Sequence, residues 1–186
     1  MFDLNQASEG STSINYQTPG IFDNVKISEF VLEETSANKV PYIRYKTIGA
    51  NNELGSSPKM FLSTDVKEGK KTSGWGVTAR NIVELIKATH NVDDDAAKAL
   101  MPAVSSKEEL AQRLSALLVN KSFRAKFKGR TTEKGNIIAE VAQVESMRVS
   151  PTKMFFNPNR DIEPFTGTTT VTSQSGLTAA SDGLPF

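Results

Sequence analysis

The sequence contains no cysteine and only one histidine, His90. The absence of cysteine excludes disulfides, thiolate zinc sites and cysteine nucleophiles. His90 has no serine-containing nucleophile motif around it, so we expect neither enzymatic activity nor a cofactor. The acidic run from Asp93 to Asp95 fits a helix N-terminus better than a metal site, because three adjacent side chains do not all face one ion. We therefore expect no metal.

Long hydrophobic runs are missing as well. No segment approaches the length of a membrane span, and the first thirty residues lack the basic start and apolar middle of a signal peptide. The glycines at 69, 74 and 76 do not have the spacing of a phosphate-binding loop. We expect a cytoplasmic protein that has no membrane contact and no ATP-driven activity.

The net charge is only +1 over 186 residues, so any affinity for nucleic acid must come from an uneven distribution of charge. The segment 122–130, SFRAKFKGR, is the most uneven. In a β-strand its side chains alternate, which places Phe123 and Phe127 on a core face and four cations, with no acid among them, on the other. This pattern favours a groove that follows a nucleic-acid backbone, or alternatively an edge strand that lysine protects from pairing. The four cations are Arg124, Lys126, Lys128 and Arg130.

The order of predicted elements is three strands, a helical segment and two strands. Alternation and turn residues predict strands at 21–34, with a β-bulge near Ser28 and Glu29, and then at 40–48, 59–66, 122–130 and 137–149. The helical segment, 77–119, contains three helices: one capped by Thr78, one starting near Asp93 and one with a capping box of Ser105 and Glu108. This order matches the oligonucleotide-binding (OB) fold, a mainly β five-stranded barrel. We predict a leader at 1–20, a barrel domain at 21–158 with the helical insert between strands three and four, and a disordered tail at 159–186.

In that fold, nucleic acid lies on the face of strands two and three, between the loop after strand one and the loop after strand four. Cations along such a face contact phosphates, and aromatic rings stack on bases for about 1 to 3 kcal/mol each. Trp75 lies in a lysine-rich loop and has two interpretations, a stacking platform or a lid over the helical insert; Phe61 is as consistent with the core as with contact. The predicted DNA-binding residues are Tyr42, Arg44, Lys46, Phe61, Lys70, Lys71, Trp75, Arg124, Lys126, Lys128, Arg130 and Lys134.

The C-terminus ends in Ser-Asp-Gly-Leu-Pro-Phe after a polar stretch rich in Ser, Thr and Gly. This ending resembles the single-stranded DNA-binding proteins, whose flexible tails end in acidic residues followed by Ile or Leu, Pro and Phe. With its leader, its PGIFDNVKI opening and its large insert, the chain looks more like the bacteriophage-encoded members of that family. In that family the tip docks on replication, recombination and repair proteins. The resemblance therefore implies that Asp182, Leu184, Pro185 and Phe186 bind a partner protein.

Together these features predict a non-enzymatic protein that binds single-stranded DNA without sequence specificity and recruits replication or recombination proteins. Two alternatives remain open from the sequence: an interaction or virion structural protein that does not bind DNA, and an RNA-binding barrel of the same fold. The sequence leaves self-association open. If the protein is phage-encoded, we expect it in the host cytoplasm.

Overall fold

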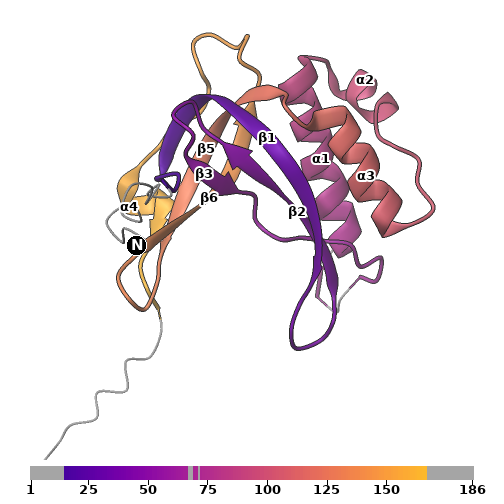
Figure 1. Cartoon of the computed structure of the whole chain (residues 1–186), viewed down its shortest axis with the longest axis horizontal. Helices are drawn as coiled ribbons and strands as arrows, with labels where there is room; N and C mark the ends of the chain where they lie inside the picture. The colour runs from indigo at the N-terminus through magenta and orange to yellow at the C-terminus, as the bar shows by residue number, and fades with distance from the viewer. Residues whose placement is uncertain (1–14, 67–68, 71, 167–186) are drawn as a thin grey trace, which may run out of the picture.

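The protein is a closed five-stranded β-barrel with three helices between its strands (Figure 1). The computed structural model describes residues 15–66, 69–70 and 72–166. Going around the barrel the strand order is β1-β2-β3-β6-β5, and β5 pairs back with β1. The β3–β6 pairing is parallel and the other four are antiparallel. This is the mainly β, OB-type barrel that the sequence predicts. Its strands are β1 (Gly20–Glu34), β2 (Pro41–Ile48), β3 (Leu54–Ser56), β5 (Ser122–Thr131) and β6 (Ile137–Glu145).

Strand β1 is long because it serves both sides of the barrel. Its second half pairs with β2 and its first half with β5. The register with β2 shifts between Ile27 and Glu29, which confirms the predicted bulge. A second shift, between Phe22 and Val25, was not predicted; it contains Asn24 in the left-handed region at φ 57°. These two irregularities let one strand curve around the closed core.

The barrel interior is filled by the apolar side of each strand. Phe123 and Phe127 are fully buried, as predicted, in one cluster with Val25, Ile27 and Ile43. The alternation that buries these rings sends the intervening cations of β5 to the outside of the barrel.

The predicted third strand at 59–66 is wrong in its position. The barrel strand is β3 (Leu54–Ser56), which lies between the predicted strands 40–48 and 59–66, and a two-residue strand β4 (Met60–Phe61) follows it. Pro58 interrupts the pairing because it has no N–H, and the Ser57 hydroxyl instead accepts from Tyr45 N at 3.1 Å. Gly55 made this strand hard to predict, because glycine is unfavourable in strands. The fold requires glycine here, since an added Cβ would lie only 2.7 Å from the Thr47 side chain and 2.8 Å from the Phe127 ring.

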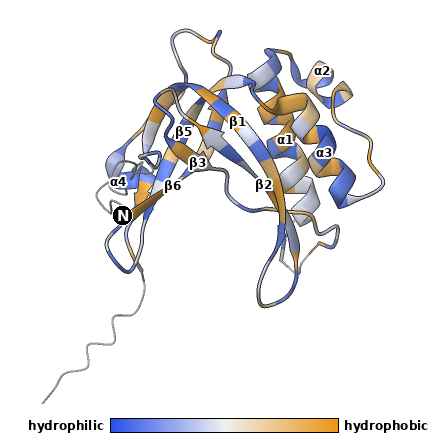
Figure 2. Cartoon of the chain, viewed as in Figure 1, coloured by the Kyte–Doolittle hydropathy of each residue, from blue (hydrophilic) through white to orange (hydrophobic). Residues whose placement is uncertain are grey.

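The helical insert covers one end of the barrel, with α1 against β4 and β6 (Figure 1). Hydrophobic and hydrophilic residues alternate along α1 and α3, as in amphipathic helices (Figure 2). Two predicted caps are wrong. The N-cap of α1 is Ser73, whereas the predicted cap, Thr78, is buried inside the helix and donates a hydrogen bond to Phe61 O. The N-cap of α3 is Ser106, one residue after the predicted Ser105. The α2 start is confirmed. The helices are α1 (Gly74–His90), α2 (Asp94–Ala99) and α3 (Lys107–Leu118).

The folded unit extends beyond both predicted boundaries. Residues 158–163 form α4 (Pro158–Asp161) and β7 (Ile162–Glu163), and β7 pairs with β5, so the predicted start of the tail at 159 is wrong. Sequence periodicity missed this segment because a buried carboxylate, Asp161, and the backbone pairing of β7 attach it, and neither leaves an apolar pattern. Within the leader, Tyr16 bridges to Leu54 and Gln17 is buried. None of the described helices is long and apolar enough to cross a membrane.

Candidate nucleic-acid interface

The outer row of cations on β5 is largely neutralised by acids from other elements, contrary to the expectation of an acid-free face. Arg124 forms ion pairs with Asp23 of β1 and, at 3.0 Å, with Glu145 of β6, and it also donates to Val149 O at 2.8 Å. Its side chain is only 13% exposed. Arg124 therefore ties β5 to its neighbours, and its guanidinium is committed within the fold.

Lys126 is buried, although its position in the strand faces outward. Residues 153–161 cover it: its ammonium lies 2.7 Å from Asp161 Oδ2 and donates to Phe155 O at 2.6 Å. Asp161 is fully buried and also accepts from Asn157 N at 2.8 Å. The hydrogen bond from Lys126, followed by that from Asn157, lowers the pKa of Asp161 to about 2. Lys126 therefore holds the C-terminal segment on the barrel and is closed off from any ligand.

The remaining cations of the row stay on the surface. Lys128 is 45% exposed, with its ammonium 3.6 Å from Asp161 Oδ1, and Arg130 is exposed. Both line a groove of about 510 Å³ that also contains Lys59, Glu140 and Glu163. Three cations against two carboxylates leave one positive charge in the groove. Lys134 adds a further exposed cation on the β5–β6 hairpin loop next to it.

The predicted residues of β2 share one face, but glutamates of β1 neutralise its cations. Arg44 lies 2.8 Å from Glu33, and Lys46 lies 2.5 Å from Glu29. The Tyr42 hydroxyl also donates to Glu33 at 2.6 Å, and this bond is the main reason that the pKa of Glu33 is lowered. These charges hold β1 and β2 together, so they add little to the affinity for an incoming anion.

An aromatic pair lies on the same face. The rings of Tyr42 and Phe61 meet edge to face, with centroids 5.9 Å apart. Tyr42 is only 5% exposed, whereas Phe61 is 37% exposed and is the ring that an incoming base could reach. The Lys59 ammonium lies 4.8 Å from the centre of the Tyr42 ring, within the range of a cation–π interaction.

Lys59 is the functional candidate that the sequence reasoning missed. Its ammonium lies over the Tyr42 ring of the aromatic pair, and Lys59 also lines the groove of Lys128 and Arg130, so it joins the two parts of the surface. The alternation Lys59-Met60-Phe61 contained the signal, because it places Lys59 on the face of Phe61 with Met60 buried between them.

The other predicted residues lie elsewhere. Trp75 begins α1 and packs on the core edge, in a hollow lined by Leu62, Val104 and Leu110. This position agrees with the lid over the helical insert. Lys70 is exposed in the preceding loop, and His90 is the last residue of α1, as expected. Lys71 and the four tip residues Asp182, Leu184, Pro185 and Phe186 lie outside the described residues.

The candidate surface, which we call the cationic groove, consists of Lys59, Lys128, Arg130 and Lys134 with Phe61 beside it. The two hairpin loops, β1–β2 and β5–β6, extend toward the same side of the barrel (Figure 1). Among the described residues no three His, Asp or Glu side chains are grouped to hold a metal ion. The groove can bind a flexible polyanion through its phosphates and one ring. The sequence matches no protein-family model and no curated protein.

Proposed function

We propose that this protein binds single-stranded DNA in the cationic groove without sequence specificity. The observation that carries the proposal is Lys59, which connects the Tyr42–Phe61 pair to Lys128 and Arg130 on an OB-type barrel. Cations that follow a backbone, next to an exposed ring, are the combination that single strands require. We also propose, from the sequence of the tip, that Asp182 to Phe186 recruit replication, recombination or repair proteins.

The structure supports a smaller electrostatic contribution than the cation row alone suggests. Arg44, Lys46, Arg124 and Lys126 are engaged in ion pairs within the fold. The cationic groove offers four cations, of which Glu140 and Glu163 offset two, so about two to four phosphates can be neutralised. The logarithm of the affinity should then fall against the logarithm of salt concentration with a slope between about −1.4 and −3.

Fluorescence anisotropy with a labelled oligothymidine tests the proposal. We expect saturable binding that is stronger than to a duplex of equal length, with the slope above. Lys59→Gln combined with Arg130→Gln should reduce the magnitude of the slope by roughly 0.7 per lost phosphate contact. Arg113→Gln is the matched control, because it removes an exposed cation on α3, away from the groove. No binding at low salt, or equal affinity for duplex, would refute the proposal; preference for the matching RNA would assign the barrel to RNA.

The tip requires a separate test. Deletion of Phe186 should leave the affinity for oligothymidine unchanged and abolish binding to purified replication or recombination proteins. Equal binding of such proteins by the full chain and the deletion variant would exclude the tip as the docking element.

One observation favours a second candidate, an interaction protein. Ile137 and Ile138 are about half exposed and pair with Thr131 and Arg130 of β5, and those two β5 residues line a hollow with Phe165, which is 44% exposed. Apolar residues gathered in this way are typical of protein contacts. Sedimentation that shows concentration-dependent self-association, together with no DNA binding, would support this candidate.

A further inference from the structure

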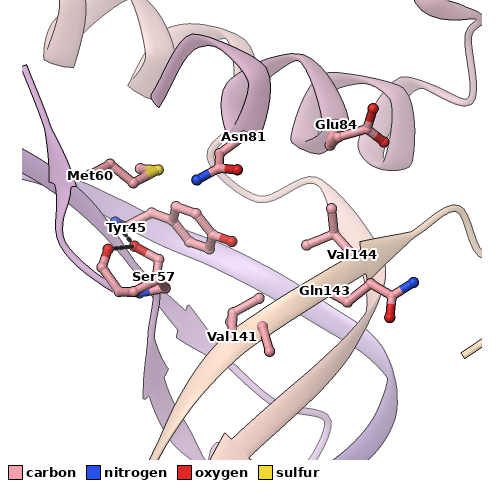
Figure 3. A pocket seen from close by; sticks show the side chains of 10 residues that line it. Tyr45, Ser57, Met60, Asn81, Glu84, Val141, Gln143 and Val144 are labelled. Carbon is pink, nitrogen blue, oxygen red and sulfur yellow. Dashed lines mark hydrogen bonds between the residues drawn. The ribbon is translucent and has the colours of Figure 1, made fainter. Parts of the chain in front are cut away.

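A cavity of about 230 Å³ lies between α1 and the barrel, beside β4 and β6, which do not pair with each other (Figure 3). Tyr45 and Met60 line it from the barrel, Asn81 and Glu84 from α1, and Val141 and Val144 from β6. It is smaller than the cavities of about 300 to 1,000 Å³ that hold drug-sized ligands, and therefore suits a single small ring system.

Tyr45 gives the cavity a buried polar group. The side chain is 5% exposed, and its hydroxyl points into the space below α1 (Figure 3). None of the residues that line the cavity forms a hydrogen bond with this hydroxyl. Burial raises the pKa of Tyr45, so the phenol stays protonated and able to donate. A hydroxyl that faces a cavity without a protein partner is available to hydrogen-bond a ligand or a water molecule there.

Two polar residues of α1 line the same space. Asn81 points toward the barrel, and Glu84, one helical turn further on, lies at the exposed rim of the cavity (Figure 3). The Asn81 amide can both donate and accept. Among the lining residues only Glu84 is charged, and it is paired with Lys87 at 2.9 Å. The cavity therefore suits an uncharged group with hydrogen-bonding edges, and the apolar side chains of Met60 and Val144 suit its flat faces.

The cavity adjoins the cationic groove, since Pro58, Val141 and Ala142 line both spaces. Ala142 is the extra residue of a β-bulge, because Val141 pairs with Phe127 and Gln143 with Lys126. Bulges next to binding sites redirect the strand locally, and here the small, exposed side chain of Ala142 lies where the two spaces adjoin.

We propose that this cavity binds one unstacked nucleobase of a single strand whose backbone lies in the cationic groove. The inference rests on the proposed function and adds a base-binding site to it. A base has the required features, which are flat apolar faces, an edge of donors and acceptors, and no charge. The phosphates stay outside, beside Lys59 and Lys128, because no cation lines the cavity to pair with them.

The test uses an oligonucleotide made of abasic sugar-phosphate units, with and without one 2-aminopurine at its centre. In the wild type the single base should tighten binding about three- to tenfold, the value of one or two net hydrogen bonds. Ala142→Leu, which places a larger side chain where the two spaces adjoin, should abolish most of this gain. Because Ala142 also lines the groove, the gain is measured for each variant as the ratio of its affinities for the two oligonucleotides. Ala142→Ser is the matched control and should keep the gain. Tyr45→Phe should reduce it.

The outcomes separate the two proposals. If the wild type binds neither oligonucleotide, the proposed function fails, and the base site fails with it. If the abasic strand binds and the gain from the base is the same in Ala142→Leu as in the wild type, the base site is refuted while DNA binding stands. A gain that Phe61→Ala removes and Ala142→Leu retains would place the base on the exposed ring of the groove, which also refutes the cavity.

Discussion

Replacing Lys126 by methionine should lower the free energy of unfolding by about 3 kcal/mol. The substitution removes the ion pair with Asp161, at 2.7 Å, and the hydrogen bond to Phe155 O, at 2.6 Å. Both side chains are nearly sealed from water, with exposed fractions of 6% and 0%. Removing one partner of such a pair leaves a buried charge behind, which typically costs about 3 to 5 kcal/mol. We expect the lower end, because Asn157 N still donates to Asp161 and Lys128 lies 3.6 Å from its other oxygen.

Urea denaturation followed by Trp75 fluorescence and circular dichroism measures this loss. With a slope of about 2 kcal/mol per molar urea, the midpoint should fall by about 1.5 M. Lys128→Met is the matched control on the same strand; its ammonium is more distant and half exposed, so its loss should stay below about 1 kcal/mol. The double variant Lys126→Met/Asp161→Asn should be more stable than Lys126→Met, since no charge remains buried alone. A Lys126→Met midpoint within about 0.3 M of the wild type would refute the reasoning.

Three further predictions concern pH, Arg124 and Trp75. The pKa of Asp161 is lowered to about 2, first by its hydrogen bond with Lys126, from an ordinary value of 3.8. The stability that this carboxylate contributes is therefore complete above pH of about 4 and is lost as the pH falls toward 2; urea midpoints at successive pH values should show the loss, and Lys126→Met should reduce it. Arg124→Gln should cost about 1 to 3 kcal/mol in the same assay without changing the salt slope of DNA binding, because Asp23 and Glu145 already engage the guanidinium; a changed slope would return Arg124 to the interface. The emission of Trp75 should stay constant while oligothymidine saturates the protein by anisotropy, because the ring packs near Leu62 and Leu110; strong quenching would contradict this placement.

The barrel was predictable because its signals are local. Alternation in 122–130 identifies Phe123 and Phe127 as core, and the phase change at Ser28 and Glu29 identifies the bulge of β1. The third strand was not predictable in the same way. Gly55 is required by close contacts with Thr47 and Phe127, and those residues come from other strands. Short strands that depend on their neighbours leave no periodic pattern in their own residues.

The candidate site shows the same division. Alternation alone placed Tyr42, Arg44 and Lys46 on one face of β2 and the four cations on one face of β5. In the structure these side chains do leave their strands on the predicted sides. Alternation does not say what lies opposite. Glu33 and Glu29 come from β1, and Asp161 comes from a segment that looked like linker. Lys59 belongs to the candidate site only because the fold places it beside both the Tyr42 ring and the groove along β6.

The sequence by itself determined the class of fold, the core face of each long strand and the composition of the C-terminal tip, because these depend on neighbours along the chain. The tertiary structure decided which cations remain available, since Coulomb attraction depends on distances between elements that are far apart in sequence. It neutralised Arg124 and Lys126, left Lys128 and Arg130 in a groove, and formed the cavity beside Tyr45 between α1, β4 and β6.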